Sequence, residues 1–308
     1  MSHRSAEQAE ALYAVRHWGD GYFSIDGHGR VCVCPQPRTQ DARVSLQAVM
    51  RELADQGIQP PVLIRFPQIL ADRVQRMRSA FGKAAMALGY QGGYLPVYPI
   101  KVNQRRVVLE GILAERDAPV GLEAGSKPEL AAIMALAPEG GTLVCNGYKD
   151  RGYIRLALMA QQLGHRVFIV VEKRSELALI LEESRKLDVQ PLLGLRLRLA
   201  SMANGHWQNS GGEAAKFGLP ARDLLSTVQT LKEANLLHRL NLVHFHMGSQ
   251  ISHIRDIHRG MHEATRFMEE LAGLGARIEV VDVGGGLGVD YEGTRSRGYF
   301  SVNYTMED

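Results

Sequence analysis

Residues 166–199, RVFIVVEKRSELALILEESRKLDVQPLLGLRLRL, contain two short apolar runs on either side of a helical pattern. The runs at 166–172 and 191–199 have the length and composition of buried strands, and residues 175–187 repeat apolar side chains at the spacing of one helix face. A strand, a helix and a second strand form a right-handed βαβ unit, in which both strands run parallel. This stretch predicts an α/β protein with a parallel sheet.

The same alternation continues on both sides of this stretch. Further helical patterns occupy residues 150–163 and 253–274. Seven strands are expected in all, at residues 95–101, 120–124, 142–146, 166–172, 191–199, 240–247 and 277–283. Two folds fit this alternation. One is a parallel (β/α)8-type barrel with seven of its eight strands in this chain, and the other is an open doubly wound sheet.

The positions of polar residues favour the barrel. Barrels carry functional side chains at the carboxyl ends of many strands, whereas an open sheet gathers them at one switch point. Six polar residues lie at or near the ends of expected strands, namely Lys101, Glu123, Asn146, Arg196, His246 and Asp282. We therefore predict the barrel.

The N-terminal part of the chain has a different pattern. Residues 22–33, YFSIDGHGRVCV, alternate as a hairpin does. Helices are predicted at 44–56 and 67–89, and a short strand at 61–66, PVLIRF. Much later, the longest irregular piece covers residues 200–218 and has the length of a lid or binding loop.

Composition excludes several classes of protein. The 36 Lys and Arg against 33 Asp and Glu argue against a polycationic nucleic-acid binder. Apolar runs are far shorter than the roughly 18 residues of a membrane span, and the N-terminus lacks the apolar core of a signal peptide. Cys32, Cys34 and Cys145 are too few for a disulfide framework and favour a reducing compartment. We expect a soluble cytoplasmic protein with no nucleic-acid or membrane partner.

Lys101 is the first candidate for chemistry. In a strand over residues 95–101, its side chain would share a face with Leu95, Val97 and Pro99. If that face points inward, desolvation would lower the pKa of the amine, and a neutral amine can form an imine with a carbonyl compound. The alternative is a lysine that ends a strand and reaches water.

A glycine triplet follows the last expected strand. Gly284, Gly285 and Gly286 would expose backbone N–H groups there, as phosphate-binding loops do. A tight turn explains the triplet equally well.

Two histidines, His244 and His246, lie two residues apart in HFHMGSQ and so share one face of the strand. They could bind zinc in a metal-dependent barrel hydrolase, with partners drawn from Glu123, Asp282 and Asp290. They could instead place one imidazole against a planar cofactor, with Ser249 near a phosphate.

The remaining candidates are charged residues at strand ends. Glu123 could contact a bound ring or amine, or serve only as a cap or ion-pair partner. Arg196 and Arg198 share a strand face, and at least one should meet an anion, because two unpaired buried guanidinium groups would be costly.

Six motifs together resemble a known family. In order and spacing, the chain is similar to the biosynthetic arginine decarboxylases, which are pyridoxal-phosphate enzymes of the alanine-racemase/ornithine-decarboxylase fold type. The motifs are YPIKVNQ, GLEAGSKPEL, CNGYKDR, KFGL, HFHMGSQI and DVGGGLGVDYEGTRS. The resemblance implies a cofactor-binding barrel over residues 91–308, incomplete at its C-terminal end. Residues 1–90 would contribute the first helix and strands of a second, mostly missing β domain.

The resemblance also implies roles for individual residues. Lys101 is similar to the lysine that bonds covalently to the cofactor, and His246 to a histidine stacked on its ring. Ser249 and the glycines Gly284, Gly285 and Gly286 would hold the phosphate. Glu123 would lie close to the reactive nitrogen, and Arg196 beneath the ring. The run associated with substrate is Val281, Asp282, Val283, Gly284, Gly285, Gly286, Leu287, Gly288, Val289, Asp290 and Tyr291.

The implied activity is decarboxylation of L-arginine to agmatine in polyamine biosynthesis. The implied cofactor is pyridoxal 5'-phosphate, a magnesium requirement is left open, and the full-length enzyme would be a homo-oligomer. Two other functions stay open: a pyridoxal-phosphate-binding regulatory protein without turnover, and the metal-dependent hydrolase. Asp290 and Glu292 are candidates for binding the substrate guanidinium.

The chain departs from the family at its C-terminal end. Full members are much longer and add an eighth strand with an acidic-Gly-Arg motif, a β domain and a proton-donating cysteine contributed across a dimer interface. None of the three cysteines here lies in a matching motif. We expect a gene fragment or a truncated chain, poorly soluble because strand edges are exposed, and nearly inactive by itself.

Overall fold

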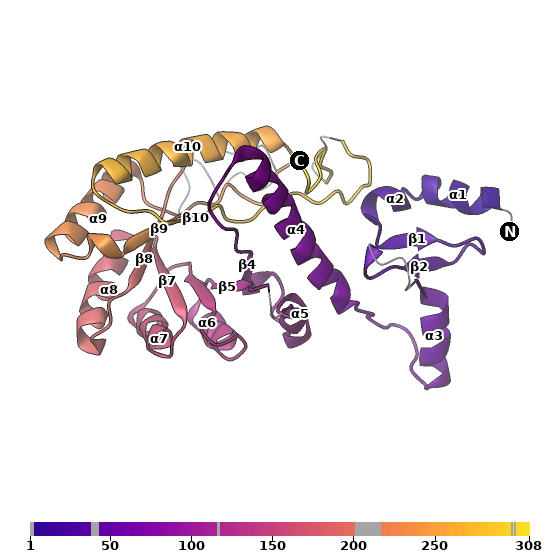
Figure 1. Ribbon diagram of the computed structural model, residues 1–308. Coiled ribbons are helices and arrows are strands. Elements are labelled where there is room, and N and C mark those ends of the chain that lie inside the picture. Colours follow the sequence, from indigo (N-terminus) through magenta and orange to yellow (C-terminus); the bar gives the residue numbers. More distant parts are fainter. Residues whose placement is uncertain (1–2, 38–42, 116–117, 201–216, 297, 299) are drawn as a thin grey trace. The chain divides into compact units, whose positions relative to one another are not determined.

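The computed structural model describes residues 3–37, 43–115, 118–200, 217–296, 298 and 300–308. Seven parallel strands form the main sheet, in the order β10-β9-β8-β7-β6-β5-β4 (Figure 1). They are β4 (Val97–Pro99), β5 (Gly121–Ala124), β6 (Thr142–Cys145), β7 (Arg166–Val171), β8 (Leu192–Arg196), β9 (Leu240–His244) and β10 (Val280–Asp282). All seven predicted strands are confirmed, and each is shorter than predicted.

The strand order distinguishes the two folds that the sequence allowed. From β4 to β10, every strand pairs with its neighbours in sequence, so the order never reverses. A doubly wound sheet needs such a reversal at its switch point. The sheet is therefore part of a (β/α)8-type barrel, as predicted.

Alternate residues of these strands form an apolar core. Val144, Phe168, Val170 and Leu242 make a buried cluster, and the partly buried Val97, Leu192 and Val280 pack against it. In β7 all residues after the first are buried. A strand that is apolar on both faces is typical of a parallel sheet covered by helices.

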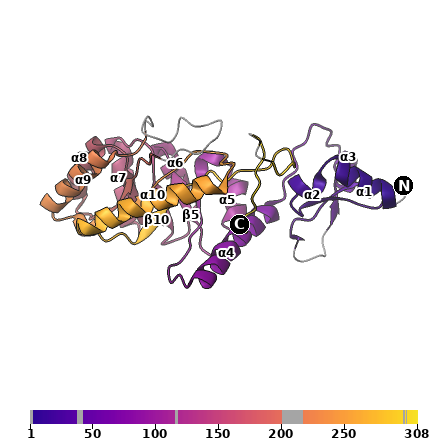
Figure 2. The same ribbon diagram turned by 90° about the horizontal axis from the view of Figure 1, so that it is seen from above.

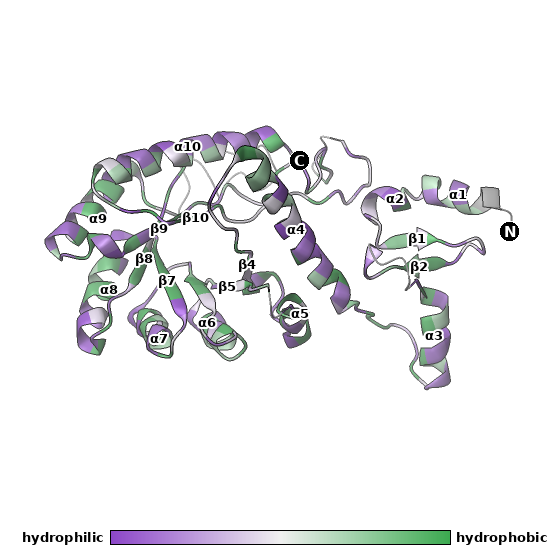
Figure 3. Ribbon diagram, viewed as in Figure 1, coloured by the Kyte–Doolittle hydropathy of each residue, from purple (hydrophilic) through white to green (hydrophobic). Residues whose placement is uncertain are grey.

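Helices connect the strands of this sheet. They are α6 (Lys127–Met134), α7 (Arg151–Gln162), α8 (Arg174–Leu187), α9 (Ala221–Glu233) and α10 (Ile254–Gly273). Neighbouring helices α6, α7 and α8 pack against one another in sequence order (Figures 1 and 2). Apolar and polar residues alternate along α10 (Figure 3), which buries one side at residues such as Ala264 and Leu271. The predicted helices at 150–163, 175–187 and 253–274 are confirmed.

The N-terminal segment contains a separate antiparallel sheet. Its strands β1 (Phe23–Ile25), β2 (Val31–Val33) and β3 (Val44–Ser45) pair in that order, which confirms the predicted hairpin. Its helices are α1 (His3–Leu12), α2 (Val15–Trp18), α3 (Leu46–Asp55) and α4 (Pro67–Leu88), to which α5 (Arg106–Ile112) adds a further helix that packs against α4. The two predicted helices there are confirmed.

The predicted strand at 61–66 is wrong, because these residues adopt no regular structure. The segment begins with Pro61 and lies between Pro60 and Pro67. Proline cannot donate a ladder hydrogen bond. The apolar composition of PVLIRF indicated a strand, but the structure gives it no neighbouring strand to pair with.

The chain divides into two compact units. Unit 1 comprises residues 1–94, 105–116 and 289–308, and unit 2 comprises residues 95–104 and 117–288. The predicted domain boundary between residues 90 and 91 stays a prediction. The predicted loop at 200–218 lies almost entirely outside the described residues. No helix in the described part of the chain is long and apolar enough to cross a membrane.

Candidate functional site

Two charged groups meet at the carboxyl ends of β4 and β5. Lys101 lies in the single 3-10 turn that follows β4, η2 (Ile100–Val102). Its Nζ is 3.2 Å from Oε1 of Glu123 on β5. The two strands pair in parallel with Pro99 opposite Glu123, so both side chains leave the same edge of the sheet.

Of the two surroundings considered for Lys101, the structure agrees with the one in which the lysine ends a strand and reaches water. The residue lies beyond the strand, so it does not continue the face formed by Val97 and Pro99. Its side chain is 61% exposed, so it is not the desolvated amine that an inward-facing strand would give. Ile100 instead is buried, and the turn places the amine outside the apolar core.

His246 lies two residues beyond the end of β9. Burial lowers the pKa of its imidazole to about 4, and the neighbouring His244, Arg196 and Lys101 add to the effect. The ring is therefore neutral near pH 7. A neutral, largely buried imidazole is suited to flat contact with another ring.

The glycine triplet after β10 combines a backbone that favours glycine with one open position. Gly284 and Gly286 have φ angles of 69° and 105°, in the left-handed region that favours glycine. A Cβ on Gly286 would lie 1.9 Å from the carbonyl oxygen of Gly248, whereas a Cβ on Gly285 would meet nothing within 4 Å. The angles account for glycine at 284 and 286, no turn is assigned to these residues, and phosphate binding by the triplet stays a prediction. Ser249 is exposed in the loop that follows β9.

Arg196 meets an anion, as predicted for at least one arginine of its strand. It ends β8, and its Nη1 lies 3.0 Å from both carboxylate oxygens of Glu172. Arg198 lies beyond the strand and donates from Nη2 to the carbonyl oxygen of Gly218 at 2.8 Å. Among the residues that the structure describes, a carboxylate partner is found for Arg196 but not for Arg198.

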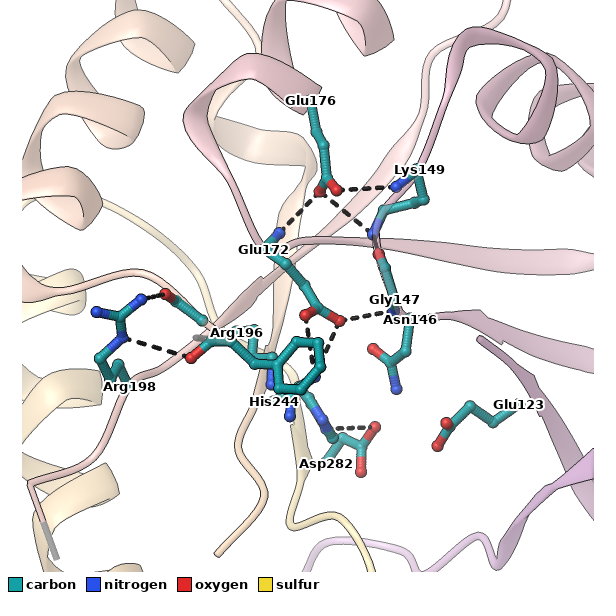
Figure 4. Close-up of polar contacts among 12 residues, drawn as sticks. Glu123, Asn146, Gly147, Lys149, Glu172, Glu176, Arg196, Arg198, His244 and Asp282 are labelled. Atoms are coloured by element: carbon teal, nitrogen blue, oxygen red, sulfur yellow. Dashed lines mark hydrogen bonds and ion pairs between the residues drawn. The ribbon is translucent and has the colours of Figure 1, made fainter. Parts of the chain in front are cut away.

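A buried charged network extends from this pair and was missed by the sequence analysis (Figure 4). Glu172 also accepts from the backbone N–H of Gly147 at 2.6 Å. Glu176 accepts from the backbone N–H groups of Lys149 and Glu172, and Nζ of Lys149 lies 3.3 Å from its Oε2. Burial lowers the pKa of Lys149, although both glutamates oppose the shift. One feature of the sequence could have indicated this network, because Glu172 ends the strand expected beside that of Arg196.

His244 is paired with Asp282. The two residues end β9 and β10, and Nδ1 of His244 lies 2.9 Å from Oδ2 of Asp282. Burial raises the pKa of Asp282, but His244 and the N–H of Gly284 outweigh it, and the pKa is lowered overall. Within the ranges that the structure describes, no three His, Cys, Asp or Glu side chains could hold a metal ion together. The geometry places the His244 imidazole beside the Asp282 carboxylate.

The run from residue 281 to residue 291 is divided between the two units. Residues up to 288 belong to unit 2, where Leu287 forms a bridge with Ile251, and residues 289 to 291 belong to unit 1. Val281, Val283 and Leu287 are exposed. The carboxylate of Asp290 already accepts from the backbone N–H of Arg295 at 3.0 Å, so part of its capacity is used within its own loop.

Comparison with known proteins shows what this arrangement is similar to. The family model described as the pyridoxal binding domain of pyridoxal-dependent decarboxylases matches residues 71–305. A biosynthetic arginine decarboxylase of Marinobacter nauticus is 56% identical over 311 residues, covering 99% of this chain and 49% of the relative. The chain thus spans about half the length of the curated relatives it matches.

Solved structures show the same relationship. The crystal structure of a biosynthetic arginine decarboxylase from Campylobacter jejuni has a TM-score of 0.84 and 33% identity, and covers 96% of this chain and 48% of that one. A diaminopimelate decarboxylase from M. jannaschi, 23% identical with a TM-score of 0.67, covers 89% of this chain and 58% of that one and shares the fold.

Proposed function

Because this chain belongs to the family of pyridoxal-dependent decarboxylases, we propose that it is the cofactor-binding part of an arginine decarboxylase, which converts L-arginine to agmatine and carbon dioxide. The observation that carries the proposal is the 3.2 Å contact between Lys101 and Glu123 at the strand edge. A reactive amine must be accessible and oriented, and Lys101 is both.

The residues present fit pyridoxal phosphate. The segment Gly284 to Gly286 leaves the backbone at Gly285 open, as a bound phosphate requires. His246 offers a neutral ring for stacking. The cofactor would be held by Lys101, Glu123, Arg196, His246, Ser249 and the three glycines.

Each of these residues would have a distinct task. Lys101 would bond to the cofactor and later hold a proton at Nζ, with Glu123 orienting that amine. His246 would pack on one face of the ring, and Arg196, fixed by Glu172, would stay in place beneath it. When bound, pyridoxal phosphate supplies a ring that accepts the electron pair released as the carboxyl group leaves.

The substrate is proposed from the relatives named above, which are called biosynthetic arginine decarboxylases. The run from Val281 to Tyr291 is proposed to contact it. A role in polyamine synthesis and assembly as a homo-oligomer are further proposals. The three cysteines are free and buried, which suits the proposed location in the reducing cytoplasm.

Trapping with borohydride tests the cofactor chemistry. The chain is incubated with pyridoxal phosphate, reduced and digested, and the labelled peptide is identified by mass spectrometry. We expect the label on Lys101 and its loss in Lys101→Ala. Lys127→Ala is the matched control, because Lys127 is also exposed and paired with a carboxylate, that of Asp150. A label on another lysine, or none, would overturn the proposal.

Release of carbon dioxide tests the substrate. The rates from arginine, ornithine and lysine are compared in the longer protein that would carry this chain, because the chain is expected to be nearly inactive by itself, and arginine should rank first. Cofactor binding at Lys101 of that longer protein without release from any of the three would favour the regulatory protein instead. Equal rates with all three would contradict arginine as the substrate.

A further inference from the structure

Asn146 follows β6, and both its backbone N–H and its backbone carbonyl group have hydrogen-bond partners. Its N–H donates to the carbonyl oxygen of Ala124 at 2.9 Å, and its carbonyl oxygen accepts from the hydroxyl of Tyr153 at 3.2 Å. The next residue, Gly147, is tied to Glu172. The main chain at Asn146 is therefore fixed by groups that do not involve its side chain.

The side chain of Asn146, by contrast, is incompletely satisfied. The residue is 4% exposed, yet its Oδ1 has no hydrogen-bond partner among the residues that the structure describes. Buried polar atoms are nearly always paired, because leaving one unpaired costs its lost hydration. The amide thus fits a group that is supplied from outside the chain.

The direction in which the Asn146 amide points restricts which part of a ligand can bind to it. Figure 4 shows it pointing toward the side on which Glu123 and Asp282 lie. β6 is next to β5, which carries Glu123, the partner of Lys101, whereas β10, which precedes the three glycines, is at the other end of the strand order from β4. The amide of Asn146 therefore lies on the side of the site that carries the amine.

We propose that Asn146 binds the ring hydroxyl of pyridoxal phosphate, an inference that rests on the proposed function. In this cofactor the hydroxyl and the phosphate-bearing arm flank the aldehyde on opposite sides. With the aldehyde carbon at Lys101 and the phosphate at the three glycines, the hydroxyl faces the side of β5 and β6. An amide can donate to or accept from a hydroxyl, so it matches this group in either ionisation state.

Binding measurements with two cofactors test this contact. The dissociation constants of pyridoxal phosphate and of 3-deoxypyridoxal 5'-phosphate, which lacks the ring hydroxyl, are measured by absorbance titration for the native chain and for Asn146→Ala. We expect the variant to bind pyridoxal phosphate about tenfold more weakly, as for one lost hydrogen bond to a ligand. It should bind the deoxy analogue as the native chain does.

Controls separate this role from a structural one. Asn241→Ala changes an asparagine near the start of β9, at the other end of the strands, and should alter neither constant. The melting temperature of Asn146→Ala should stay near that of the native chain, because the substitution removes an unpaired polar atom. A large drop in melting temperature would indicate a structural role and overturn the inference.

Two other results have different meanings. If Asn146→Ala weakens both cofactors equally, or neither, the contact with the hydroxyl is wrong while the proposed function stands. If the native chain binds neither cofactor, the proposed function fails and the inference fails with it.

Discussion

The ionisation of His246 predicts how stability depends on pH. The pKa is about 4 in the folded chain against an ordinary value of 6.5. Between these pH values the unfolded chain binds a proton that the folded chain does not, so the free energy of unfolding decreases as the pH falls. The contribution of His246 to that free energy is complete above about pH 6.5 and is lost as the pH falls toward 4. A shift of this size corresponds to at most about 3 kcal/mol.

A substitution isolates this contribution. Since glutamine does not titrate, His246→Gln should lose less free energy of unfolding than the native chain between pH 7 and pH 5, as measured by urea denaturation. His258→Gln, an exposed position on α10, is the control and should keep the native dependence. Identical pH profiles for the native chain and His246→Gln would contradict the burial argument.

Single residues also show what sequence could and could not predict. Lys101, Glu123 and Arg196 were identifiable because polar side chains after apolar runs mark strand ends. The exposure of Lys101 was one of two open alternatives, and the choice between them depends on a turn that begins two residues earlier than expected. The strands of Glu172 and Arg196 were expected side by side, but the pairing itself depends on how the two side chains are oriented, which residue patterns do not fix.

The glycine segment after β10, residues 284–286, predicts opposite outcomes for two adjacent glycines. Gly286→Ala places a Cβ against the carbonyl of Gly248 at a strained φ, and should lower the free energy of unfolding by about 1–3 kcal/mol. Gly285→Ala meets no neighbouring atom and should leave stability nearly unchanged while weakening pyridoxal phosphate, if the phosphate lies there. Urea denaturation and cofactor titration measure both. Equal destabilisation by the two variants would argue against this backbone geometry.

The network between β7 and β8 predicts a large loss in the free energy of unfolding when one of its buried charges is removed. Glu172→Gln leaves the guanidinium of Arg196 without its anion, and should cost about 3 kcal/mol in the free energy of unfolding. Glu182→Gln on α8 removes an exposed carboxylate that also pairs with an arginine, Arg151, and should change stability little. Similar losses in the two variants would show that burial does not set the strength of the Glu172 pair.

Secondary structure was predictable where periodicity and packing agree. All seven strands of the sheet were expected, because each is an apolar run between helical patterns. The segment 61–66 has the same composition but lacks a partner, and no local pattern reveals that. Strand ends were overestimated for a related reason: β4 stops at Pro99, although apolar residues continue to Ile100 and Val102.

Across the whole chain, burial is distributed unevenly between the two units. In unit 2, β7 is buried at every residue after the first, and its neighbours β6 and β8 are mostly buried. In unit 1, α3 and α4 contain no buried residue. Local opening costs least where few apolar contacts are lost, so the two units should differ in local stability.

Hydrogen exchange can measure this difference. Amides of β7 should exchange at least about a hundredfold more slowly than those of α4 after correction for intrinsic rates, because opening β7 disrupts the sheet core whereas α4 can fray by itself. The amides of α7, which has a buried face, serve as a helical control and should exchange more slowly than those of α4. Matching rates in α4, α7 and β7 would mean that the chain opens as one cooperative unit, since the slowest step would then be shared by all three elements.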